Sequence, residues 1–389
     1  MPGATWDLPA EFEWRPGPRL VVEPAGITRL GGLARELGGT RVLVASDPGI
    51  VDAGHAAAGI EALEEAGLAT ALFSAFGENP TEAQVAAGAA VARDFRPDLL
   101  VGVGGGSSMD CAKGINFLVS CGGRMRDYRG RGTATGPMLP SIAVPTTAGT
   151  GSETQSFALV TDDATGLKMA CGDPRAAFRT AILDVNLTLT QPLSLAALTG
   201  IDALSHAVES HVSRAATPAS RVFSREAWRL LAANLPLILV NGGGTIGARS
   251  AVQFGAALAG LAIENAMLGA AHALANPLTA AHHVVHGQAV GLVLPHVVRF
   301  NGAACGERYA ELLGDVGIES APAAAGDRLA AWIADLIATA GLAPSLTTLG
   351  VVAPDVATLA IAAAAQWTAG FNPRPAGAAD LTALYEACR

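Results

Sequence analysis

Three short apolar segments in the first half of the chain predict buried parallel strands. They are Arg41–Ser46, Asp98–Val103 and Ser141–Pro145, and each runs directly into Gly, Pro, Asp or Thr. Buried parallel strands show this pattern where they enter functional loops. Alanine-rich helical stretches, such as His55–Ala66 and Glu82–Arg93, separate the first two segments. This alternation is typical of a doubly wound α/β domain with a mostly parallel sheet.

The pattern changes after about Asn186. Long segments rich in Ala, Leu and other helix-forming residues, such as Arg221–Leu235 and Asp327–Ala340, dominate the second half, with Gly- or Pro-containing breaks between them. Gly242–Gly244 is interpreted as one of these loops. We therefore expect two domains, an α/β domain over residues 1–186 and an all-helical domain over residues 187–389.

Residues 265–298 contain no Asp, Glu, Lys or Arg, so by length alone they could be proposed as a membrane span. We reject that interpretation because Asn276, Gln288, Pro277 and Pro295 are costly in lipid or interrupt a helix. Five histidines add to this cost: His272, His282, His283, His286 and His296. A buried helical core, in which hydrogen bonds satisfy some of these histidines, is the alternative to a functional cluster.

Composition narrows the classes of protein further. Half of the 389 residues are hydrophobic and 15% are charged, which excludes disorder for the chain as a whole. With 25 Lys and Arg against 34 Asp and Glu, and no dense basic stretch, a nucleic-acid partner is not expected. Five scattered cysteines predict reduced thiols. Residues 1–14 lack the basic start and apolar core of a secretory signal, which predicts a cytoplasmic location.

A glycine-rich segment after the second strand predicts a phosphate-binding loop. Residues 102–110 are GVGGGSSMD and lie where a buried strand ends and a helix begins. Glycines let the backbone approach a phosphate, and the free N–H groups of a helix start attract an anion. The segment departs from G-x-G-x-x-G, because Ser107 replaces the third glycine, and it is not a Walker loop. A turn capped by Ser107, with Asp110 three residues on, is the alternative.

Two other loops follow strands and carry suitable polar groups. Asp47 follows the first strand, where a carboxylate can accept hydrogen bonds from a ribose and repel a 2′-phosphate, although capping of the next turn explains it equally well. Residues 145–153, PTTAGTGSE, are suited to ribose and diphosphate oxygens, with an ordinary polar loop as the alternative. The candidate cofactor contacts in the glycine-rich and hydroxyl-rich loops are Gly105, Gly106, Ser107, Asp110, Thr146 and Thr147.

A metal site is the most specific chemical hypothesis. Asp202 and His206 are spaced i, i+4, which puts both side chains on one helix face. His272 and a histidine about fourteen residues later can supply two more ligands, from a later helix and the loop following it. One carboxylate with imidazoles suits Fe(II) or Zn(II) and leaves a position for substrate. Spacing alone leaves three candidates for the last ligand, His282, His283 and His286, and unrelated histidines are the alternative.

Two other catalytic schemes are excluded by the sequence. There is no Tyr-x-x-x-Lys dyad of the short-chain dehydrogenase type, and no G-x-S-x-G nucleophile elbow is present.

In their order along the chain, these elements resemble the iron-dependent (group III) alcohol dehydrogenase family. The elements are residues 102–113 (GVGGGSSMDCAK), residues 145–153, the helix with Asp202 and His206, then His272, and His286-Gly287. The match extends from about Val21 to Asn372-Pro373-Arg374. It implies an N-terminal nucleotide-binding α/β domain, an all-helical C-terminal domain, and a metal and nicotinamide that meet in the cleft between them.

The resemblance also assigns residues. It puts the metal ligands on Asp202, His206, His272 and His286, which favours His286 over its neighbours. It puts cofactor contacts on Asp47, Asn79, Gly106, Ser107, Thr146, Gln155, Phe157, Lys168 and Leu187. Because NAD-preferring members have an aspartate at the position of Asp47, we expect NAD(H) as the cofactor.

Two positions depart from the family pattern. Many relatives have a second histidine four residues after the ligand at 272, whereas this chain has Asn276, which cannot titrate. A proton relay would then use water or another group, with His282 or His283 as candidates. Ile263 stands where several relatives have an aromatic residue, which leaves more room near the metal. The pocket candidates are Phe157, Ile263, Thr368 and Phe371.

We therefore expect an NAD- and metal-dependent dehydrogenase or aldehyde reductase that acts on a small primary alcohol or diol. The metal, Fe(II) first and Zn(II) second, would act as a Lewis acid, so no protein nucleophile is needed. A homo-dimer or larger homo-oligomer is expected, with no membrane partner. The alternatives are a glycerol dehydrogenase, a maleylacetate reductase, a lyase of the dehydroquinate synthase type, or a non-catalytic nucleotide-binding protein; the four-ligand set favours the alcohol dehydrogenase branch.

Overall fold

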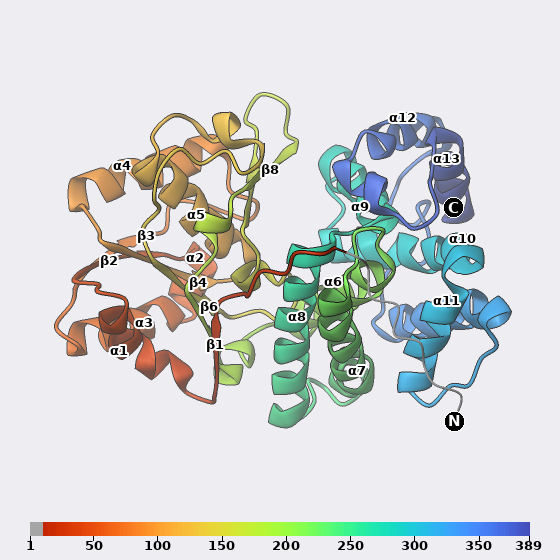
Figure 1. The fold of residues 1–389 in the computed structure, drawn as a ribbon, viewed down its shortest axis with the longest axis horizontal. Helices are drawn as coiled ribbons and strands as arrows, with labels where there is room; N and C mark the ends of the chain where they lie inside the picture. Colours follow the sequence, from red (N-terminus) through yellow and green to blue (C-terminus); the bar gives the residue numbers. More distant parts are fainter. Residues whose placement is uncertain (1–10) are drawn as a thin grey trace.

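The computed structural model describes residues 11–389 as an α/β part followed by a helical part (Figure 1). The sheet and its helices occupy the left of Figure 1, and helices α6 to α13 occupy the right. The predicted fold class is confirmed.

The main sheet has six parallel strands in the order β1-β9-β6-β4-β2-β3. Its strands are β1 (Arg19–Val22), β2 (Arg41–Ala45), β3 (Ala69–Phe73), β4 (Leu99–Gly104), β6 (Ser141–Pro145) and β9 (Thr180–Leu183). The three strands predicted from the sequence are β2, β4 and β6, which are neighbours in the sheet. Their carboxyl ends therefore lie side by side at one edge.

Helices cover both faces of this sheet, because successive side chains of a strand point to opposite faces. Leu43 and Ala45 of β2 pack with α4 (Glu82–Phe95) and α5 (Gly106–Ser120). Val42 and Val44 pack on the other face, whose helices are α1 (Leu30–Glu36) and α3 (His55–Glu65). The central strand β4 is buried at every position, which explains its uninterrupted apolar sequence.

A smaller sheet stands beside the main one and carries Phe157 and Lys168, two predicted cofactor contacts. Its order is β5-β8-β7, with β7 and β8 antiparallel. The strands are β5 (Gly130–Arg131), β7 (Phe157–Thr161) and β8 (Lys168–Gly172). Arg131, Phe157 and Lys168 therefore belong to one structural unit.

The second half is helical, as predicted. Its helices are α6 (Leu193–Val212), α7 (Pro218–Val240), α8 (Ile246–Ala266), α9 (Ala270–His282), α10 (His286–Asp315), α11 (Pro322–Thr339), α12 (Ala353–Ala364) and α13 (Ala378–Ala387). A capping box between Thr217 and Ser220 and a proline at the first helical position fix the start of α7. The predicted loop at Gly242–Gly244 separates α7 from α8, and all three glycines have positive φ.

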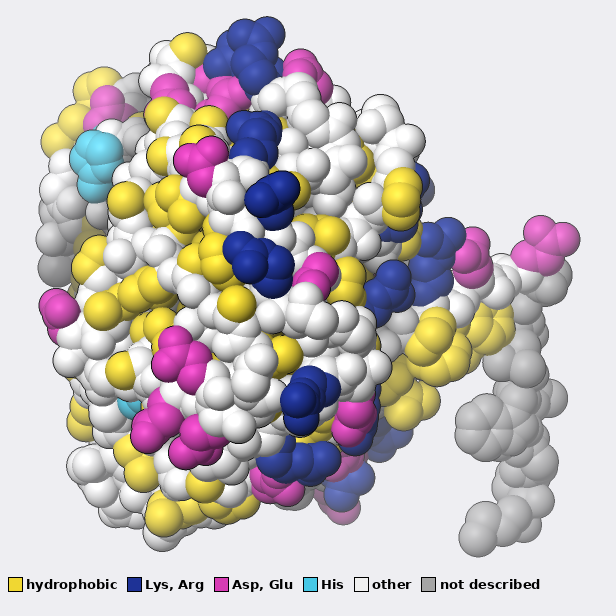
Figure 2. Space-filling view, turned by 90° about the vertical axis from the view of Figure 1, so that its left-hand side faces the viewer, with side chains coloured by type: hydrophobic (Ala, Val, Ile, Leu, Met, Phe, Trp, Pro, Cys, Tyr) yellow, Lys and Arg dark blue, Asp and Glu magenta, His cyan; other side chains and the backbone are white. Residues whose placement is uncertain are grey.

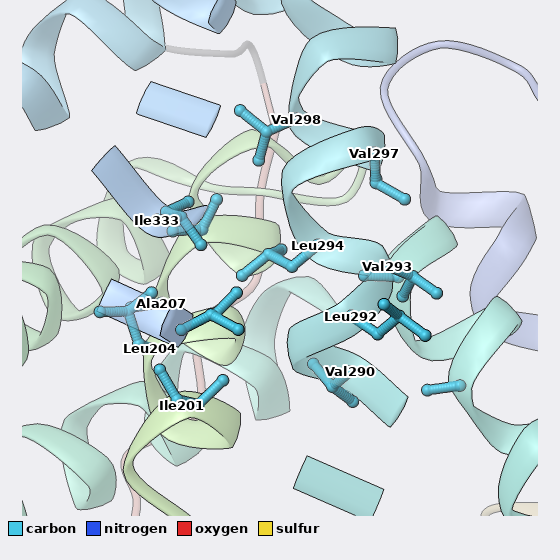
Figure 3. Close-up of a cluster of buried hydrophobic side chains, with 14 of the residues drawn as sticks. Ile201, Leu204, Ala207, Val290, Leu292, Val293, Leu294, Val297, Val298 and Ile333 are labelled. Atoms are coloured by element: carbon cyan, nitrogen blue, oxygen red, sulfur yellow. The ribbon is translucent and has the colours of Figure 1, made fainter. Parts of the chain in front are cut away.

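The core of the helical part forms where α6, α10 and α11 meet. Figure 3 shows Val290 and Leu294 of α10 facing Ile201 and Ala207 of α6, with Ile333 of α11 alongside. These residues are fully buried. The packing fixes the relative positions of two helices that carry predicted metal ligands, α6 and α10.

The uncharged segment 265–298 does not form one continuous helix. It is divided between α9 and α10 by a break at His283, which has a left-handed backbone (φ 54°). We expected His286 in the loop after α9, but it is the first residue of α10. Pro277 and Pro295, which we expected to interrupt a helix, lie inside α9 and α10. A different helix, α8, is long and apolar enough to span a membrane, but 72% of its apolar window is buried inside the protein. It is a core helix.

The surface of the α/β part carries mixed charge. On the face shown in Figure 2, Lys and Arg side chains are interspersed with Asp and Glu, and hydrophobic side chains are scattered among them. Such a surface lacks the single-sign field of a nucleic-acid site on this face.

The two parts of the chain make close contact. Trp14 stacks on Phe223 of α7 at 6.3 Å between ring centroids, and the Arg15 N–H donates to Asn265 Oδ1 at 3.2 Å. Trp14 and Arg15 thus belong to residues 1–186 by sequence, but they pack on the helical part. The expected boundary at residue 186 falls within a 3-10 turn, Val185–Thr188.

A close approach between the parts joins Gly260 of α8 to the loop at Gly151. A Cβ atom on Gly260 would lie 2.2 Å from Thr154 Oγ1 and 2.5 Å from the Gly151 carbonyl oxygen. The contact is therefore available only to a residue without a side chain.

We expect Gly260→Ala to lower the free energy of unfolding by about 1–3 kcal/mol, because α8 must move away from the loop. Gly247→Ala is the matched control on the same helix, since its Cβ would meet only Thr245 Oγ1 at 3.8 Å. That control should be neutral or more stable by up to about 1 kcal/mol. Thermal melts of both variants test this, and equal melting temperatures would contradict it.

Candidate functional site

The three polar loops predicted from the sequence meet at the carboxyl ends of β2, β4 and β6. Thr146 N–H donates to the Gly104 carbonyl at 2.9 Å. A Cβ atom on Gly105 would lie 3.4 Å from Thr147 Oγ1, and one on Gly106 would lie 2.9 Å from Thr150 Cγ2. The glycine-rich loop and the hydroxyl-rich loop are thus in direct contact, and α5 starts from this point.

Asp47 faces the same edge and has two roles. Its Oδ2 accepts a hydrogen bond from Ser108 Oγ at 2.9 Å, which ties β2 to the start of α5. Its Oδ1 accepts from Ile50 N–H at 3.3 Å and caps the short helix α2 (Pro48–Asp52). The capping role considered from the sequence is therefore present, and the carboxylate also stands beside the glycine-rich loop.

Asn79 and Ser107 are also brought together. Asn79, which has a left-handed backbone (φ 55°), donates its N–H to Ser107 Oγ at 3.1 Å. Thr146 Oγ1 is buried and makes no hydrogen bond to residues 11–389. An unpaired buried hydroxyl at this edge is available to a ligand.

Asp110 and Lys113, one helical turn apart on α5, both make hydrogen bonds to Ser152 of the hydroxyl-rich loop. Lys113 Nζ is fully buried and donates to the Ser152 carbonyl at 2.7 Å, to Ser152 Oγ at 2.9 Å and to the Phe157 carbonyl at 2.7 Å. Asp110 Oδ1 accepts from Ser152 Oγ at 2.8 Å. Burial lowers the pKa of Lys113 to about 8 despite the nearby carboxylates. All three donors of the ammonium are used, so α5 is fixed to the segment that leads to Phe157.

The remaining predicted cofactor residues divide into two groups. Gln155 Nε2 donates to the Thr150 carbonyl at 2.9 Å, and both Phe157 and Lys168 line the cavity described below. Burial lowers the pKa of Lys168. Leu187 is buried with the hydrophobic residues of the main sheet and does not line that cavity. Its contact with a cofactor stays a prediction.

The predicted metal ligands converge. Asp202 Oδ1 lies 3.3 Å from His206 Nε2, 3.4 Å from His272 Nε2 and 3.7 Å from His286 Nε2. The Nε2 atoms of His206 and His272 are 3.1 Å apart. The four side chains come from α6, α9 and α10, so the cluster depends on the packing of three helices.

The ligand atoms of Asp202, His206 and His272 lie within 4.8 Å of one another and fit a single divalent ion, and His286 Nε2 lies 3.7 Å from the Asp202 carboxylate. Ligand atoms about 2.0–2.2 Å from a tetrahedral ion lie about 3.3–3.6 Å from one another, close to the separations seen here. Asp202 Oδ1 is buried and makes no hydrogen bond to residues 11–389. A buried carboxylate oxygen without a donor requires another source of positive charge, and one carboxylate with three imidazoles suits Fe(II) or Zn(II).

Burial and the neighbouring charges shift the pKa values of the four side chains in different directions. Burial alone would raise the pKa of Asp202, but the three surrounding histidines outweigh burial and hold that pKa below its ordinary value. Burial lowers the pKa of His206 to about 4 and that of His286 to about 3. His272 differs, because the charges of Asp202 and Glu209 and the hydrogen bond with Glu209 overcome burial and raise its pKa to about 9.

The structure separates the neighbouring histidines from this cluster. His282 Nε2 lies 3.7 Å from Asp355 Oδ2, whereas His283 lines the cavity. Asn276 also lines the cavity, and its Nδ2 donates to Gln366 Oε1 at 3.1 Å. Of the two candidates for the missing family histidine, His283 is therefore the one whose imidazole faces the same space as Asn276.

A cavity of about 950 Å³ lies between the α/β part and the helical part. Asn79, Phe157 and Lys168 line it from one side, and Met267 and His283 line it from the other. The metal ligands are not among its lining residues, but Lys168 lowers the pKa of His286 and is itself affected by the charge of Asp202. The cavity and the cluster are thus electrostatically coupled.

The aromatic wall of this cavity includes a residue that the sequence did not single out. Trp367, from the 3-10 turn Trp367–Phe371, has its ring centroid 5.5 Å from that of Phe157 and 6.1 Å from that of Phe371. Phe157 and Phe371 are predicted pocket residues that line the cavity. Ile263 and Thr368 are each 4% exposed and do not line it, so their role in a pocket stays a prediction.

Two more supporting residues were missed, although the sequence contained a signal for each. Glu209 is three residues after His206, which puts it on the same helix face, and it accepts hydrogen bonds from the His272 side chain and the Ala271 N–H. Lys113 is the last residue of the glycine-rich motif 102–113 and lies one helical turn after Asp110. Helical periodicity could have grouped Glu209 with His206 and Lys113 with Asp110. It could not have shown that Glu209 contacts His272 or that Lys113 contacts Ser152.

A sheet edge with glycine-rich and hydroxyl-rich loops, together with a buried cluster of one carboxylate and imidazoles, is typical of metal- and nucleotide-dependent oxidoreductases. Comparison with known proteins identifies the family within that class. The family model described as iron-containing alcohol dehydrogenase matches residues 17–185, and its C-terminal companion, described as Fe-containing alcohol dehydrogenase family, C-terminal, matches residues 196–388.

Individual relatives agree with the family models. The NAD-dependent methanol dehydrogenase of Bacillus methanolicus is 34% identical over 372 residues, covering 95% of this chain and 97% of that protein. The 1,3-propanediol dehydrogenase of Klebsiella pneumoniae is 35% identical over 369 residues, covering 93% and 95%. A crystal structure of a 1,3-propanediol oxidoreductase superposes with a TM-score of 0.94 at 33% identity, covering 97% of this chain and all of the other.

The chain belongs to the iron-containing alcohol dehydrogenase family, as the ordered motifs predicted. Enzymes of this family use NAD(H) and an iron ion, and this chain is an NAD-dependent oxidoreductase of the alcohol dehydrogenase and aldehyde reductase type.

One buried acid near the cofactor loops makes stability depend on pH. Burial raises the pKa of Glu153 from 4.5 to about 7. The folded protein therefore binds a proton that the unfolded chain releases between these values, so stability falls as the pH rises through this window.

We expect Glu153→Gln to remove this dependence, which amounts to about 3 kcal/mol between pH 4.5 and pH 7. Urea unfolding at pH 5 and pH 7.5 measures it, with the exposed Glu61→Gln as the control that should behave as wild type. Parallel pH profiles for wild type and Glu153→Gln would show that the acid is not responsible.

Proposed function

We propose that this chain catalyses reversible hydride transfer between NAD(H) and a small primary alcohol or diol and the corresponding aldehyde. The proposed metal ligands are Asp202, His206, His272 and His286, with Fe(II) as the native ion and Zn(II) as a substitute. The main support is the convergence of four ligand atoms, with Asp202 Oδ1 between 3.3 and 3.7 Å from each Nε2.

The bound groups supply the central chemistry: the metal is a Lewis acid for the substrate oxygen, and NAD(H) accepts or donates the hydride. The chain's own residues prepare the site. The glycine-rich and hydroxyl-rich loops orient the dinucleotide at the sheet edge, with Asp47 suited to a ribose. The aromatic side chains of Phe157, Trp367 and Phe371 limit the water around the reacting atoms.

Proton movement needs a group other than Asn276. His283 lines the same cavity, and an imidazole has nitrogen atoms that can donate and accept hydrogen bonds. We assign to His283 the exchange of a proton between the cavity and solvent, in place of the histidine that many relatives have at position 276.

The cavity size and the relatives favour a small substrate. A volume of about 950 Å³ must hold the nicotinamide end of the cofactor as well as the alcohol. Similar enzymes are named for methanol and 1,3-propanediol. The division at residue 186, the homo-oligomer and the cytoplasmic location stay predictions.

We expect His286→Ala to lower kcat for NADH-dependent aldehyde reduction by about 100-fold or more, because a Lewis acid stabilises developing charge by several kcal/mol. The assay uses anaerobically purified protein reconstituted with Fe(II) or Zn(II), a panel of small aldehydes, and the loss of NADH absorbance. Metal content is measured on the same samples.

The matched control is His296→Ala, which removes a half-buried imidazole from the same helix outside the cluster. It should retain both metal and turnover. Metal-free wild-type protein, or turnover that does not depend on His286, would overturn the proposed function.

We also expect Trp367→Ala to raise kcat/KM for 1-hexanol relative to ethanol by about 10-fold, since removal of the ring widens the cavity beside Phe157. Trp14→Ala is the control, because Trp14 is equally exposed (45% against 46%) and stacks on Phe223 instead. An equal change for both alcohols in Trp367→Ala would show that the ring does not select substrates.

A further inference from the structure

We propose that Glu209 is a positioning residue of the metal site. Its carboxylate fixes both the tautomer of His272 and the start of the helix that carries it, so that His272 Nε2 faces the other ligands. This inference rests on the proposed metal site, and it assigns a role to a residue that is not itself a ligand.

Both oxygens of Glu209 are used. Oε2 lies 2.5 Å from His272 Nδ1, and Oε1 accepts the Ala271 N–H at 2.7 Å. Glu209 lies on α6 three residues after His206 and is 4% exposed. A carboxylate this far from water holds its partners tightly, because no solvent competes for either oxygen.

The first contact selects the tautomer. An imidazole that binds a metal ion is neutral and carries one N–H, and a carboxylate accepts but does not donate. Nδ1 must therefore carry the hydrogen, which leaves the Nε2 lone pair directed at the cluster, 3.1 Å from His206 Nε2 and 3.4 Å from Asp202 Oδ1. By contrast, Nδ1 of His206 and Nδ1 of His286 make no hydrogen bond to residues 11–389.

The second contact positions α9. The first N–H groups of a helix have no partner within the helix, and those of α9 are bound by side chains from distant parts of the chain. Ala270 N–H donates to Asn372 Oδ1 at 3.2 Å, and Ala271 N–H donates to Glu209. A negative charge at this end also interacts favourably with the helix dipole. The place of His272, at the third residue of α9, is therefore set by α6.

Gly269 makes this approach possible. A Cβ atom there would lie 2.9 Å from Asn372 Oδ1 and 3.0 Å from Glu209 Oε1. Only a residue without a side chain leaves room for both acceptors at the start of α9.

The experiment measures binding of Zn²⁺ alone by competition with a chromophoric chelator, and the visible absorption spectrum of the Co²⁺-loaded protein. In Glu209→Gln the amide has one acceptor oxygen for two donors, so either the tautomer or the Ala271 contact is lost. We expect the Kd for Zn²⁺ to rise by about 10- to 100-fold, with a changed Co²⁺ spectrum. Glu209→Asp, which keeps the charge but shortens the reach, should recover part of the affinity.

Glu311→Gln is the matched control. Glu311 Oε2 lies 3.3 Å from Nε2 of His211, a second buried histidine of α6 that is not a predicted ligand. This variant should bind Zn²⁺ as wild type does. If the Kd for Zn²⁺ rises in Glu209→Gln and stays unchanged in Glu311→Gln, the effect belongs to the pair at the metal site and not to the loss of any carboxylate–histidine pair.

The outcomes are distinguishable. If wild type binds Zn²⁺, His272→Ala does not, and Glu209→Gln binds with unchanged Kd and Co²⁺ spectrum, the metal site stands and the role of Glu209 is overturned. If wild type binds no Zn²⁺, the proposed metal site fails and the role of Glu209 fails with it. Should Glu209→Gln not fold, Glu209→Asp decides, because an affinity and spectrum equal to wild type would contradict the proposal.

Discussion

The structure depends most on the burial of one carboxylate among three imidazoles. An ionised carboxylate removed from water is costly unless hydrogen bonds or positive charge compensate it. Asp202 Oδ1 has no hydrogen bond within residues 11–389, and three imidazole nitrogens lie 3.3–3.7 Å from it. The cluster is therefore suited to a cation. The helices that carry it must be held in place by other contacts, because burying the ionised carboxylate is unfavourable. The apolar contacts among α6, α10 and α11 and the capping of α9 by Glu209 and Asn372 provide this support.

The same constraint explains why the two parts of the chain are joined so closely. The cofactor loops belong to the α/β part and the cluster belongs to the helical part, so the reaction requires a fixed junction. Small residues and polar contacts make that junction. Gly151 and Gly260 meet backbone to backbone, and Glu264 of α8 accepts hydrogen bonds from both the N–H and the hydroxyl of Ser156. Phe157 and Trp367 complete it with an aromatic contact across the cavity.

The features predicted from sequence were those encoded locally. Apolar runs that lead into Asp, Gly or Thr predicted β2, β4 and β6, and the order of the motifs predicted the family. The i, i+4 spacing grouped Asp202 with His206, but the choice of His286 required the resemblance, because three histidines have similar spacing from His272. The structure brings His286 to the cluster through the start of α10, a boundary that sequence periodicity placed in a loop.

Features that depend on the tertiary fold could not be predicted. Trp367 reaches Phe157 across more than two hundred residues of sequence, and the three acceptors of Lys113 come from a segment about forty residues later. Ile263 and Thr368 were candidates because of their place in the family pattern, whereas the structure buries both away from the cavity lining. Which face of a helix meets which neighbour is decided by packing, and a motif does not contain that information.

The account is tested most directly by locating a bound metal. Crystals of the protein grown with Zn²⁺ or Fe²⁺, measured at the absorption edge of that metal, should give one strong anomalous peak. The peak should lie about 2.0–2.2 Å from Asp202 Oδ1 and from Nε2 of His206, His272 and His286. A peak bound elsewhere, or no peak at these four atoms in metal-saturated crystals, would contradict the account.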